Sequence, residues 1–253
     1  MQPFRKIFEH EVIDVMRDFK VPGMSVLITK DNDVIYDRGF GYGDLTKRKP
    51  ATSDTLYGIA SITKSMTCLA ILQLFQNGKL NIHDSISKYL PIELNFKDKP
   101  ITLHHLMSHS SGMPSLDTYA FIMVNQGYNA NIPTLPLGTW DDFYSLVNEA
   151  QSELLSPPES KYYYWNGGFT LLGQIIEKVT GMSYAEYMKQ EIFNKLGMSR
   201  STFFREDLDT DPNVSSGYVY DLDGKNIKRT PTPHLSSPFI SSAGGMNTSA
   251  KEL

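Results

Sequence analysis

The stretch Ser61-Ile-Thr-Lys-Ser-Met-Thr-Cys-Leu-Ala-Ile-Leu-Gln-Leu-Phe-Gln-Asn77 decides the fold. Its residues are apolar on nearly all faces of a helix, and Gly78 follows where helices commonly end. We therefore expect a helix buried in the centre of the molecule and opened by Ser61. Unpaired backbone N–H groups and the helix dipole at such a first turn favour developing negative charge.

Lys64 follows Ser61 by three residues, so both side chains lie on the same face of the predicted helix. An uncharged lysine amine there could take the proton of the serine hydroxyl. A chain of this size holds roughly one Ser-x-x-Lys by chance, and a second one does occur, at Ser85 and Lys88. Its polar context predicts a solvated helical turn. For Ser61 taken alone, an ordinary helix N-cap is the competing interpretation.

Tyr164-Trp165-Asn166 is the only Tyr-x-Asn in the sequence, and it directly precedes a second apolar helical run. In an extended segment the side chains at i and i+2 point the same way. Tyr164 and Asn166 therefore offer together a proton shuttle and a partner for a substrate carbonyl or a lysine. Aromatic packing is the alternative interpretation, and the pairing with Ser61 and Lys64 favours the chemical one.

Periodicity predicts further elements on both sides of the central helix. Before it come a surface helix over 4–19 and a hairpin of strands 24–29 and 34–40. The glycines at 39, 41 and 43 are interpreted as turn residues, because no helix follows them as a dinucleotide loop requires. After the central helix we expect a lid over 114–136, a strand over 217–220, and helices near 84–89, 103–107, 143–154, 171–179 and 183–196.

Composition excludes several classes of protein. The 253 residues suit one large domain or a domain with an inserted subdomain, and 24 Lys+Arg against 28 Asp+Glu give a net charge of −4. Beyond Lys47-Arg48-Lys49 there is no basic cluster, which argues against nucleic-acid or anionic-lipid partners.

No leader peptide or membrane span is seen, so we expect a cytoplasmic protein without a membrane partner. The single Cys68 excludes an internal disulfide and is expected to be a core residue.

Two histidines have a spacing that metal sites use. His105 and His109 stand at i and i+4, but the glutamate of His-Glu-x-x-His is absent and the helix is expected to end at Gly112. A zinc site is therefore disfavoured. No Gly-x-Ser-x-Gly occurs either, so a nucleophile elbow of the α/β-hydrolase kind is not supported.

With these motifs the sequence resembles the penicillin-recognising serine hydrolases, in the branch of class C β-lactamases, D-aminopeptidases, DD-carboxypeptidases and family VIII esterases. The resemblance covers nearly the whole chain. It is carried by Val21-Pro22-Gly23, Thr55 to Lys64, His105 to Gly112, Tyr164-Trp165-Asn166, Leu171-Leu172-Gly173 and Leu196-Gly197-Met198.

This resemblance implies Ser61 as the acylated nucleophile and Lys64 as its base partner. It implies Tyr164 as second base and acid for the leaving group, and Asn166 as a substrate-binding amide. It implies no metal and no organic cofactor. Whether Lys64 or Tyr164 is the first base stays open.

The sequence also departs from the family pattern. Trp165 replaces a small residue, and Glu159 stands where a Pro-Gly pair has its glycine, so both are expected to affect the shape of the substrate site. The family's third motif, Lys/His-x-Gly on a later strand, is not found before Leu253. Its neighbouring N–H completes the oxyanion hole. We therefore expect a chain truncated before its C-terminal strands, or completed by another chain.

The resemblance implies a fold of the α+β class, β-lactamase/transpeptidase-like. A single domain over 1–253 would comprise an α/β subdomain with an antiparallel sheet, 1–57 plus 197–253, and a mainly helical subdomain, 58–196, with the site at their junction.

The implied function is a serine hydrolase that forms an acyl-enzyme on an amide or ester carbonyl of a small-molecule or peptide substrate. Whether this hydrolase is a peptidase, a β-lactamase or an esterase stays open, and so does whether the chain forms an oligomer. The alternative is a non-catalytic penicillin-binding-like or interaction protein that keeps the fold without turnover.

Overall fold

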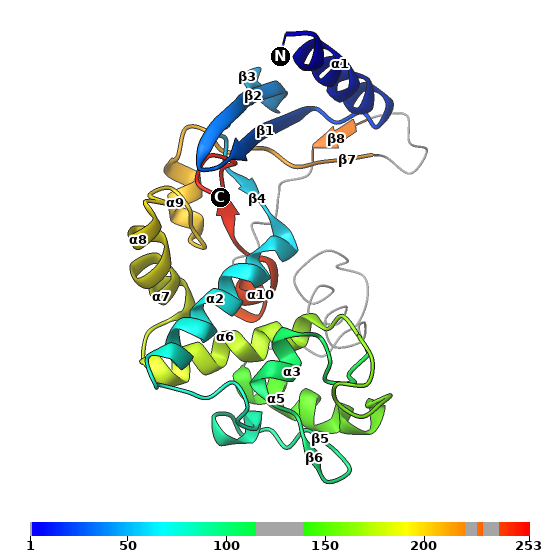
Figure 1. The fold of residues 1–253 in the computed structure, drawn as a ribbon, viewed down its shortest axis with the longest axis vertical. Coiled ribbons are helices and arrows are strands. Elements are labelled where there is room, and N and C mark those ends of the chain that lie inside the picture. Colours follow the sequence, from blue (N-terminus) through cyan, green and yellow to red (C-terminus); the bar gives the residue numbers. More distant parts are fainter. Residues whose placement is uncertain (1, 115–138, 221–226, 230–237) are drawn as a thin grey trace. The chain divides into compact units, whose positions relative to one another are not determined.

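The computed structural model describes residues 2–114, 139–220, 227–229 and 238–253 (Figure 1). Except for Pro114, the predicted lid over 114–136 lies outside the described residues. The chain divides into two compact units: unit 1 is Met1–Ile59, Phe193–Ser236 and Met246–Leu253, and unit 2 is Ala60–Ile192 and Ser237–Gly245. The boundaries predicted from the sequence for the α/β subdomain, 1–57 with 197–253, and for the mainly helical subdomain, 58–196, stay a prediction.

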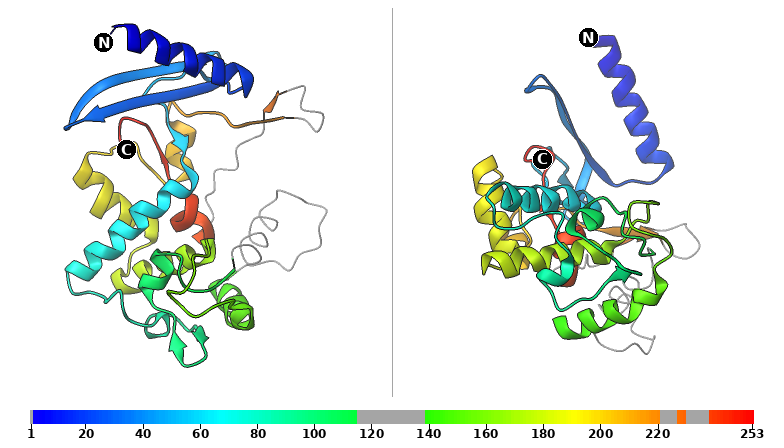
Figure 2. Two further views of the ribbon diagram at one scale, coloured as in Figure 1. Left: turned by 45° about the vertical axis from the view of Figure 1, so that its right-hand side comes forward. Right: turned by 60° about the horizontal axis from the view of Figure 1, so that its bottom comes forward.

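Unit 1 is built on a three-stranded antiparallel sheet in the order β1 (Gly23–Lys30), β2 (Asp33–Asp44) and β3 (Lys49–Pro50). Asp31 and Asn32 connect the first two strands with positive φ angles of 51° and 70°, the backbone that two-residue hairpin turns need. The predicted hairpin is confirmed. The surface helix α1 (Gln2–Asp18) lies along this sheet (Figure 2). The ring of Phe8 on this helix meets the ring of Tyr36 edge-on, with the ring centres 5.3 Å apart.

The interpretation of the glycines at 39, 41 and 43 as turn residues was wrong, because all three lie within β2. A Cβ on Gly39 would lie 1.7 Å from the carbonyl oxygen of Ala51, so only glycine lets the next segment approach. Gly41 has a φ of +64° beside an irregular register. Close backbone approach, rather than a turn, explains Gly39 and Gly41, whereas a Cβ on Gly43 would meet the side chain of Thr55 at 3.2 Å.

The remaining elements of unit 1 are short. They are β4 (Tyr57–Gly58) paired with β9 (Asn247–Thr248), β7 (Tyr218–Tyr220) paired with β8 (Ile227–Arg229), and the helices α8 (Asn194–Leu196) and α9 (Arg205–Thr210). The strand predicted over 217–220 is confirmed. All the named strand pairs are antiparallel.

Unit 2 is mainly helical and is centred on α2 (Thr63–Gln76), α6 (Asn166–Thr180) and α10 (Pro238–Gly244). Each of these helices contacts the other two (Figures 1 and 2). Gly173 of α6 allows this packing, since a Cβ there would lie 2.4 Å from Ser242 Oγ of α10. The core formed in this way holds the segment that carries Ser61.

The position of the central helix along the chain was predicted correctly. The structure of its first turn and the extent of its burial were not. Ser61 lies in a preceding 3-10 turn, η1 (Ala60–Ile62), and Ala60 has a left-handed φ of +46°. One side of α2 is buried, through Ala70, Ile71 and Leu74, whereas Leu69 and Leu72 each keep 43% of their surface exposed. An apolar sequence on all faces thus did not mean burial on all faces.

Around the three central helices unit 2 has smaller elements. Three of the predicted helices correspond to α3 (Leu103–Met107), α5 (Trp140–Glu149) with the 3-10 turn η4 (Ala150–Glu153), and α7 (Tyr184–Tyr187), which continues through the π-helical η5 (Met188–Phe193). Ser183 caps α7 in the predicted capping box with Glu186. The helix expected near 84–89 is only a 3-10 turn, η2 (Ile86–Lys88), which precedes the hairpin β5 (Asn95–Phe96) and β6 (Lys99–Pro100). Within the described residues, no helix is both long and apolar enough to cross a membrane.

Candidate active site

Lys64 is the best-connected side chain of the site. Its Nζ donates to Ser61 Oγ at 3.1 Å, to Asn166 Oδ1 at 2.7 Å and to the carbonyl oxygen of Ala243 at 2.6 Å. Only 6% of the residue is exposed. The spacing of three residues does bring Lys64 to Ser61, although Ser61 itself lies in the 3-10 turn. All four residues belong to unit 2.

Burial sets the protonation of this amine. Removal from water disfavours the ammonium form and lowers the pKa of Lys64 from 10.5 to about 8. A lysine with this pKa is neutral in an appreciable fraction of molecules near neutral pH, and a neutral amine can accept a proton. The site therefore holds a base within hydrogen-bond distance of a serine hydroxyl.

Tyr164 completes the polar environment of Ser61. Its hydroxyl donates to Ser61 Oγ at 2.5 Å, and its ring centre lies 4.8 Å from Lys64 Nζ. The ring of Phe169 lies 5.4 Å from the same nitrogen. Ser61 Oγ thus has a basic nitrogen and a phenol as its two partners, while two aromatic rings face the lysine.

Ser61 does not cap the central helix. The N-cap of α2 is Ile62, and its side chain makes no capping hydrogen bond. Ser61 Oγ instead receives the hydrogen bonds from Lys64 and Tyr164. The competing N-cap interpretation was wrong, because the helix begins two residues after Ser61.

The side chains of the Tyr-x-Asn segment point to two different places, the Ser61–Lys64 pair and the core. Tyr164 and Asn166 both reach the Ser61–Lys64 pair, as expected for i and i+2, and Asn166 serves as the partner of the lysine. Trp165 is 2% exposed and packs over Gly167 and Gly168, where an added Cβ would lie within 3.0 Å of its indole. The bulk of Trp165 is therefore accommodated in the core.

The second Ser-x-x-Lys forms no such pair. Ser85 caps η2 by accepting a hydrogen bond from the N–H of Ser87. Lys88 is exposed and pairs with Asp84 at 2.7 Å. The sequence context predicted that the two Ser-x-x-Lys motifs differ, and the structure confirms it, because Lys64 contacts Ser61 whereas Lys88 pairs with Asp84.

The structure adds Ala243 and His109 to the site, both of which sequence reasoning missed. Ala243 contributes only its backbone oxygen, at the end of α10, next to Gly244. The ring of His109 lies 4.3 Å from that of Tyr164, at an angle of 34°. The run of small residues Ser241 to Gly245 was the one available signal for Ala243.

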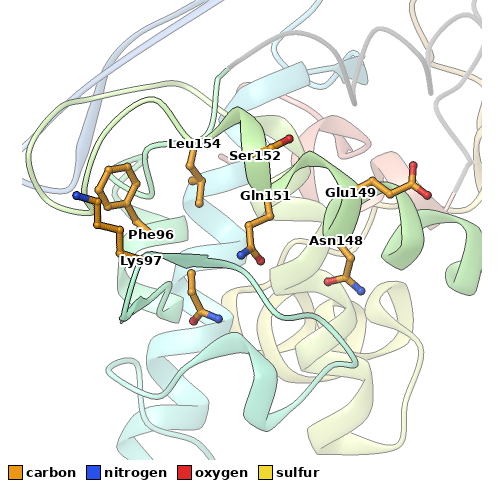
Figure 3. A pocket seen from close by; sticks show the side chains of 8 residues that line it. Phe96, Lys97, Asn148, Glu149, Gln151, Ser152 and Leu154 are labelled. Atoms are coloured by element: carbon orange, nitrogen blue, oxygen red, sulfur yellow. The ribbon is translucent and has the colours of Figure 1, made fainter.

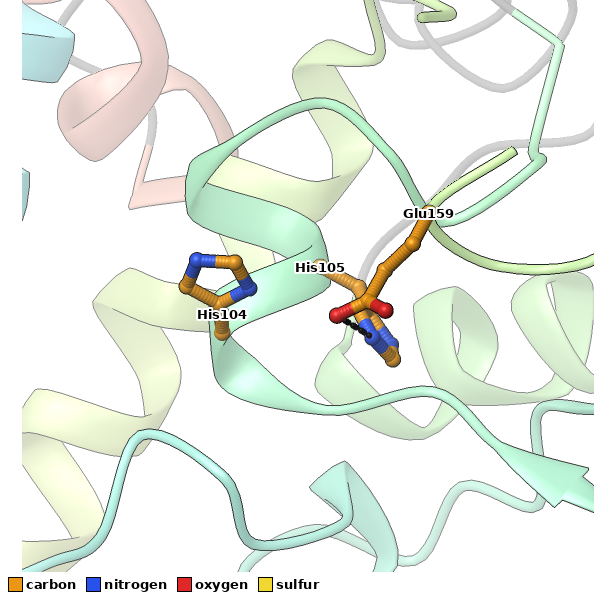
Figure 4. Close-up of side chains that lie close together, drawn as sticks. All are labelled: His104, His105 and Glu159. Carbon is orange, nitrogen blue, oxygen red and sulfur yellow. Dashed lines mark hydrogen bonds and ion pairs between the residues drawn. The ribbon is translucent and has the colours of Figure 1, made fainter. Parts of the chain in front are cut away.

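Neither histidine of the i, i+4 pair is arranged as a metal ligand. Nδ1 of His105 accepts the N–H of Thr102, and Nδ1 of His109 accepts the N–H of Trp165. In a neutral imidazole the other nitrogen then carries the proton. His104, His105 and Glu159 do lie close together, but the protonated Nε2 of His105 is directed at the Glu159 carboxylate, 3.3 Å away (Figure 4). This nitrogen has no lone pair for a cation.

Two further features lie outside the site. The thiol of Cys68 has its pKa raised to about 11 by burial, so it is not ionised near neutral pH. A hollow of about 590 Å³ lies between the β5–β6 hairpin and the end of α5, with Phe96, Lys97 and Gln151 in its lining (Figure 3). None of Ser61, Lys64 and Tyr164 lines it.

The chain is also similar in sequence to known proteins. The chain is 32% identical to penicillin-binding protein 4* of Bacillus subtilis (strain 168) over 201 residues, which are 78% of this chain and 42% of that protein. It is 34% identical to protein flp of Staphylococcus aureus (strain N315) over 205 residues, which are 80% of this chain and 38% of that protein. The chain thus spans about two-fifths of the length of these curated relatives.

Among solved structures, the octameric penicillin-binding protein homologue from Pyrococcus abyssi is similar with a TM-score of 0.87 and 39% identity. The match covers 96% of this chain and 53% of that one. This likeness confirms the predicted α+β fold of β-lactamase/transpeptidase type. The Beta-lactamase family profile matches residues 8–253, nearly the whole chain, and this protein therefore belongs to the Beta-lactamase family.

Proposed function

We propose that this chain is a serine hydrolase that works through an acyl-enzyme on Ser61. The observation that carries the proposal is that Ser61 Oγ accepts hydrogen bonds from both Lys64 Nζ and the Tyr164 hydroxyl. A serine oxygen held between a base and an acid has the two partners that acyl transfer requires. Membership of the Beta-lactamase family supports the same reaction class.

Lys64 is the first base in this proposal. Asn166 Oδ1 and the Ala243 carbonyl oxygen can only accept, so a neutral amine gives its two N–H groups to them. Its lone pair is then left for the third direction, toward Ser61 Oγ. The lowered pKa of Lys64, about 8, makes this neutral form accessible.

The reaction has an acylation stage and a deacylation stage. Ser61 Oγ attacks the carbonyl carbon of the substrate while its proton passes to Lys64 Nζ. The tetrahedral intermediate then expels the amine or alcohol, which takes a proton from the Tyr164 hydroxyl, and the acyl group stays on Ser61. Lys64 returns its proton to the Tyr164 phenolate. A water molecule then attacks the ester carbonyl, its oxygen and one hydrogen stay on the acyl group as a carboxylic acid, and its other proton passes through neutral Lys64 to Ser61 Oγ.

The substrate in this proposal is a small molecule or peptide with an amide or ester carbonyl. A D-amino-acid peptide, a β-lactam and an ester all fit the chemistry of Ser61. The similar Pyrococcus abyssi protein is octameric, so we include self-association of copies of this chain in the proposal.

Turnover separates a hydrolase from an acyl-binding protein without turnover. We would follow product release from a nitrophenyl ester, benzylpenicillin and a D-alanyl-D-alanine peptide with the whole chain. The proposal expects one of them to be released well beyond one equivalent per chain, and Ser61→Ala to lose that release. Release that stops at one equivalent would favour the non-catalytic alternative, and turnover unaffected by Ser61→Ala would contradict the proposal.

A further inference from the structure

We propose that His109 is a positioning residue for Tyr164, an inference that rests on the proposed function. His109 comes two residues after the end of α3 and is 8% exposed. Its backbone has a φ of +55°, in the left-handed region that side chains rarely adopt. A buried residue held in this conformation is fixed by its surroundings.

Both neighbours of Tyr164 are bonded to His109. The N–H of Tyr163 donates to the carbonyl oxygen of His109 at 2.9 Å. The N–H of Trp165 donates to the Nδ1 atom of the His109 ring at 3.1 Å. The backbone on either side of Tyr164 is thus bonded to one residue, through its main chain and its side chain.

The ring of His109 also supports the ring of Tyr164. The two ring centres are 4.3 Å apart, and the same imidazole lies 5.1 Å from Phe169 and 5.5 Å from Tyr162. His109 therefore bonds the backbone of both residues that flank Tyr164, and its imidazole lies against the Tyr164 ring. Together these contacts fix where the phenol oxygen lies.

The electrostatic state of His109 suits this role. Burial, with a smaller contribution from the charge of Lys64, lowers the pKa of His109 to about 4. The imidazole is consequently neutral near neutral pH, so Nδ1 is free to accept the N–H of Trp165. A neutral ring beside Tyr164 also adds no charge next to Lys64.

The position of the phenol matters because the Tyr164 hydroxyl lies 2.5 Å from Ser61 Oγ. Misplacement of a reacting group by about 1 Å can slow a reaction on the order of 10²-fold. Loss of the imidazole should therefore reduce the rate of acylation through Tyr164 while the protein stays folded.

The test compares His109→Asn with His105→Asn. Asparagine keeps an acceptor near the position of Nδ1 and tolerates left-handed backbone, but it lacks the ring that supports Tyr164. His105 is a matched control: it is also 8% exposed and its Nδ1 also accepts a backbone N–H, while its ring lies against His104 and Nε2 bonds Glu159 (Figure 4). His109→Gln is the second variant if His109→Asn does not fold.

We would measure the acylation rate with an alkyl ester, whose leaving alkoxide needs a proton from Tyr164, together with thermal unfolding, in the wild-type and Tyr164→Phe backgrounds. Labelling of Ser61 by a fluorophosphonate is recorded alongside. We expect His109→Asn to slow acylation by about ten- to a hundredfold in the wild-type background. In Tyr164→Phe, which keeps the ring but has no hydroxyl to position, the same substitution should change the rate less than about twofold. His105→Asn should leave the acylation rate within about twofold of wild type.

An equal effect of His109→Asn in both backgrounds would overturn the inference, because it would show a general structural role. So would a wild-type rate in the folded His109→Asn variant. Failure of the proposed function is distinguishable, since wild-type protein would then not be labelled on Ser61 at all.

Discussion

Burial of Lys64 sets the protonation chemistry at Ser61. Three oxygen atoms surround its nitrogen, from Ser61, Asn166 and Ala243, and they satisfy an ammonium ion completely. The same arrangement holds a neutral amine with its lone pair toward Ser61. Which form is present depends on pH, because the pKa of Lys64 is about 8 instead of 10.5.

The acylation rate should therefore rise with pH. If neutral Lys64 takes the proton of Ser61, the rate is proportional to the neutral fraction, which is about one-tenth at pH 7. We expect a tenfold rise per pH unit below pH 7 and a plateau above about pH 9, with the midpoint near the pKa of Lys64, about 8. Stopped-flow acylation by a nitrophenyl ester measures this profile. A rate that falls as pH rises through 8 would make the charged lysine the active form and Tyr164 the base.

The lowered pKa of Lys64 also makes the free energy of unfolding depend on pH. The pKa of Lys64 is lower in the folded chain, about 8, than its ordinary value of 10.5, so the unfolded chain binds more protons between these values. Lys64 therefore destabilises the fold below pH 8, and this destabilisation is relieved as pH rises from 8 to 10.5.

Glu159 is a strained residue on the segment that leads to Tyr164. Its φ is +66°, and its N–H donates to the carbonyl oxygen of Ser110 at 2.8 Å. Its carboxylate is mostly exposed, so the bond to His105 contributes little to stability. Glu159→Gly should raise the free energy of unfolding by about 0.5–1 kcal/mol, because glycine adopts this backbone without strain.

Urea unfolding at pH 7 measures the effect, with Glu159→Ala as the control. Alanine removes the same carboxylate but keeps the unfavourable left-handed backbone, so no rise is expected for it. A Glu159→Gly variant that is less stable than wild type would show that the His105 contact outweighs the strain.

At the scale of the elements, the packing of α6 against α10 determines where the carbonyl oxygen of Ala243 lies. This oxygen is one of the three acceptors around Lys64 Nζ. Ala243 lies on α10, and Gly173 of α6 lets the two helices approach, since a Cβ at 173 would come 2.7 Å from Ser242 Cβ. The position of the Ala243 carbonyl oxygen thus depends on a glycine in a different helix.

Gly173→Ala should destabilise the protein by about 1–3 kcal/mol and also slow acylation, because overpacking displaces α10. Gly244→Ala is the matched control on α10 itself, since a Cβ there would have no neighbour nearer than 3.6 Å. Its free energy of unfolding should stay within about 0.5 kcal/mol of wild type. Urea unfolding and fluorophosphonate labelling rates measure both effects, and equal behaviour of the two variants would contradict the packing explanation.

Local pattern predicted most elements but not their finer geometry. Periodicity located α1, α6 and the β1–β2 hairpin, since each depends on residues close in sequence. The 3-10 turn at Ser61 and the exposed side of α2 were not predicted, because tertiary contacts determine them. The glycines of β2 were misinterpreted for the same reason, since a Cβ on Gly39 would meet the backbone of Ala51 and a Cβ on Gly41 that of Pro22.

At the scale of the whole molecule, the fold brings the four predicted site residues together, and they could be found in the sequence because their side chains indicate their chemistry. Ser61, Lys64, Tyr164 and Asn166 lie in one hydrogen-bonded group, although about a hundred residues separate the two motifs along the chain. Ala243 could not be predicted in this way, because it acts through a backbone oxygen. In the sequence, His109 was considered as one of a metal-like pair and as part of the stretch His105 to Gly112, whereas its bonds to the Tyr164 segment depend on the fold.

Intact-mass measurement of covalent adducts tests Ser61 as the nucleophile most directly. The 28.6 kDa chain is incubated with a fluorophosphonate or benzylpenicillin, and wild type is compared with Ser61→Ala and Ser85→Ala. We expect one adduct on wild type and on Ser85→Ala, and none on Ser61→Ala, because Lys88 is paired with Asp84 whereas Lys64 contacts Ser61. An adduct on Ser61→Ala equal to that on wild type would contradict the assignment of Ser61.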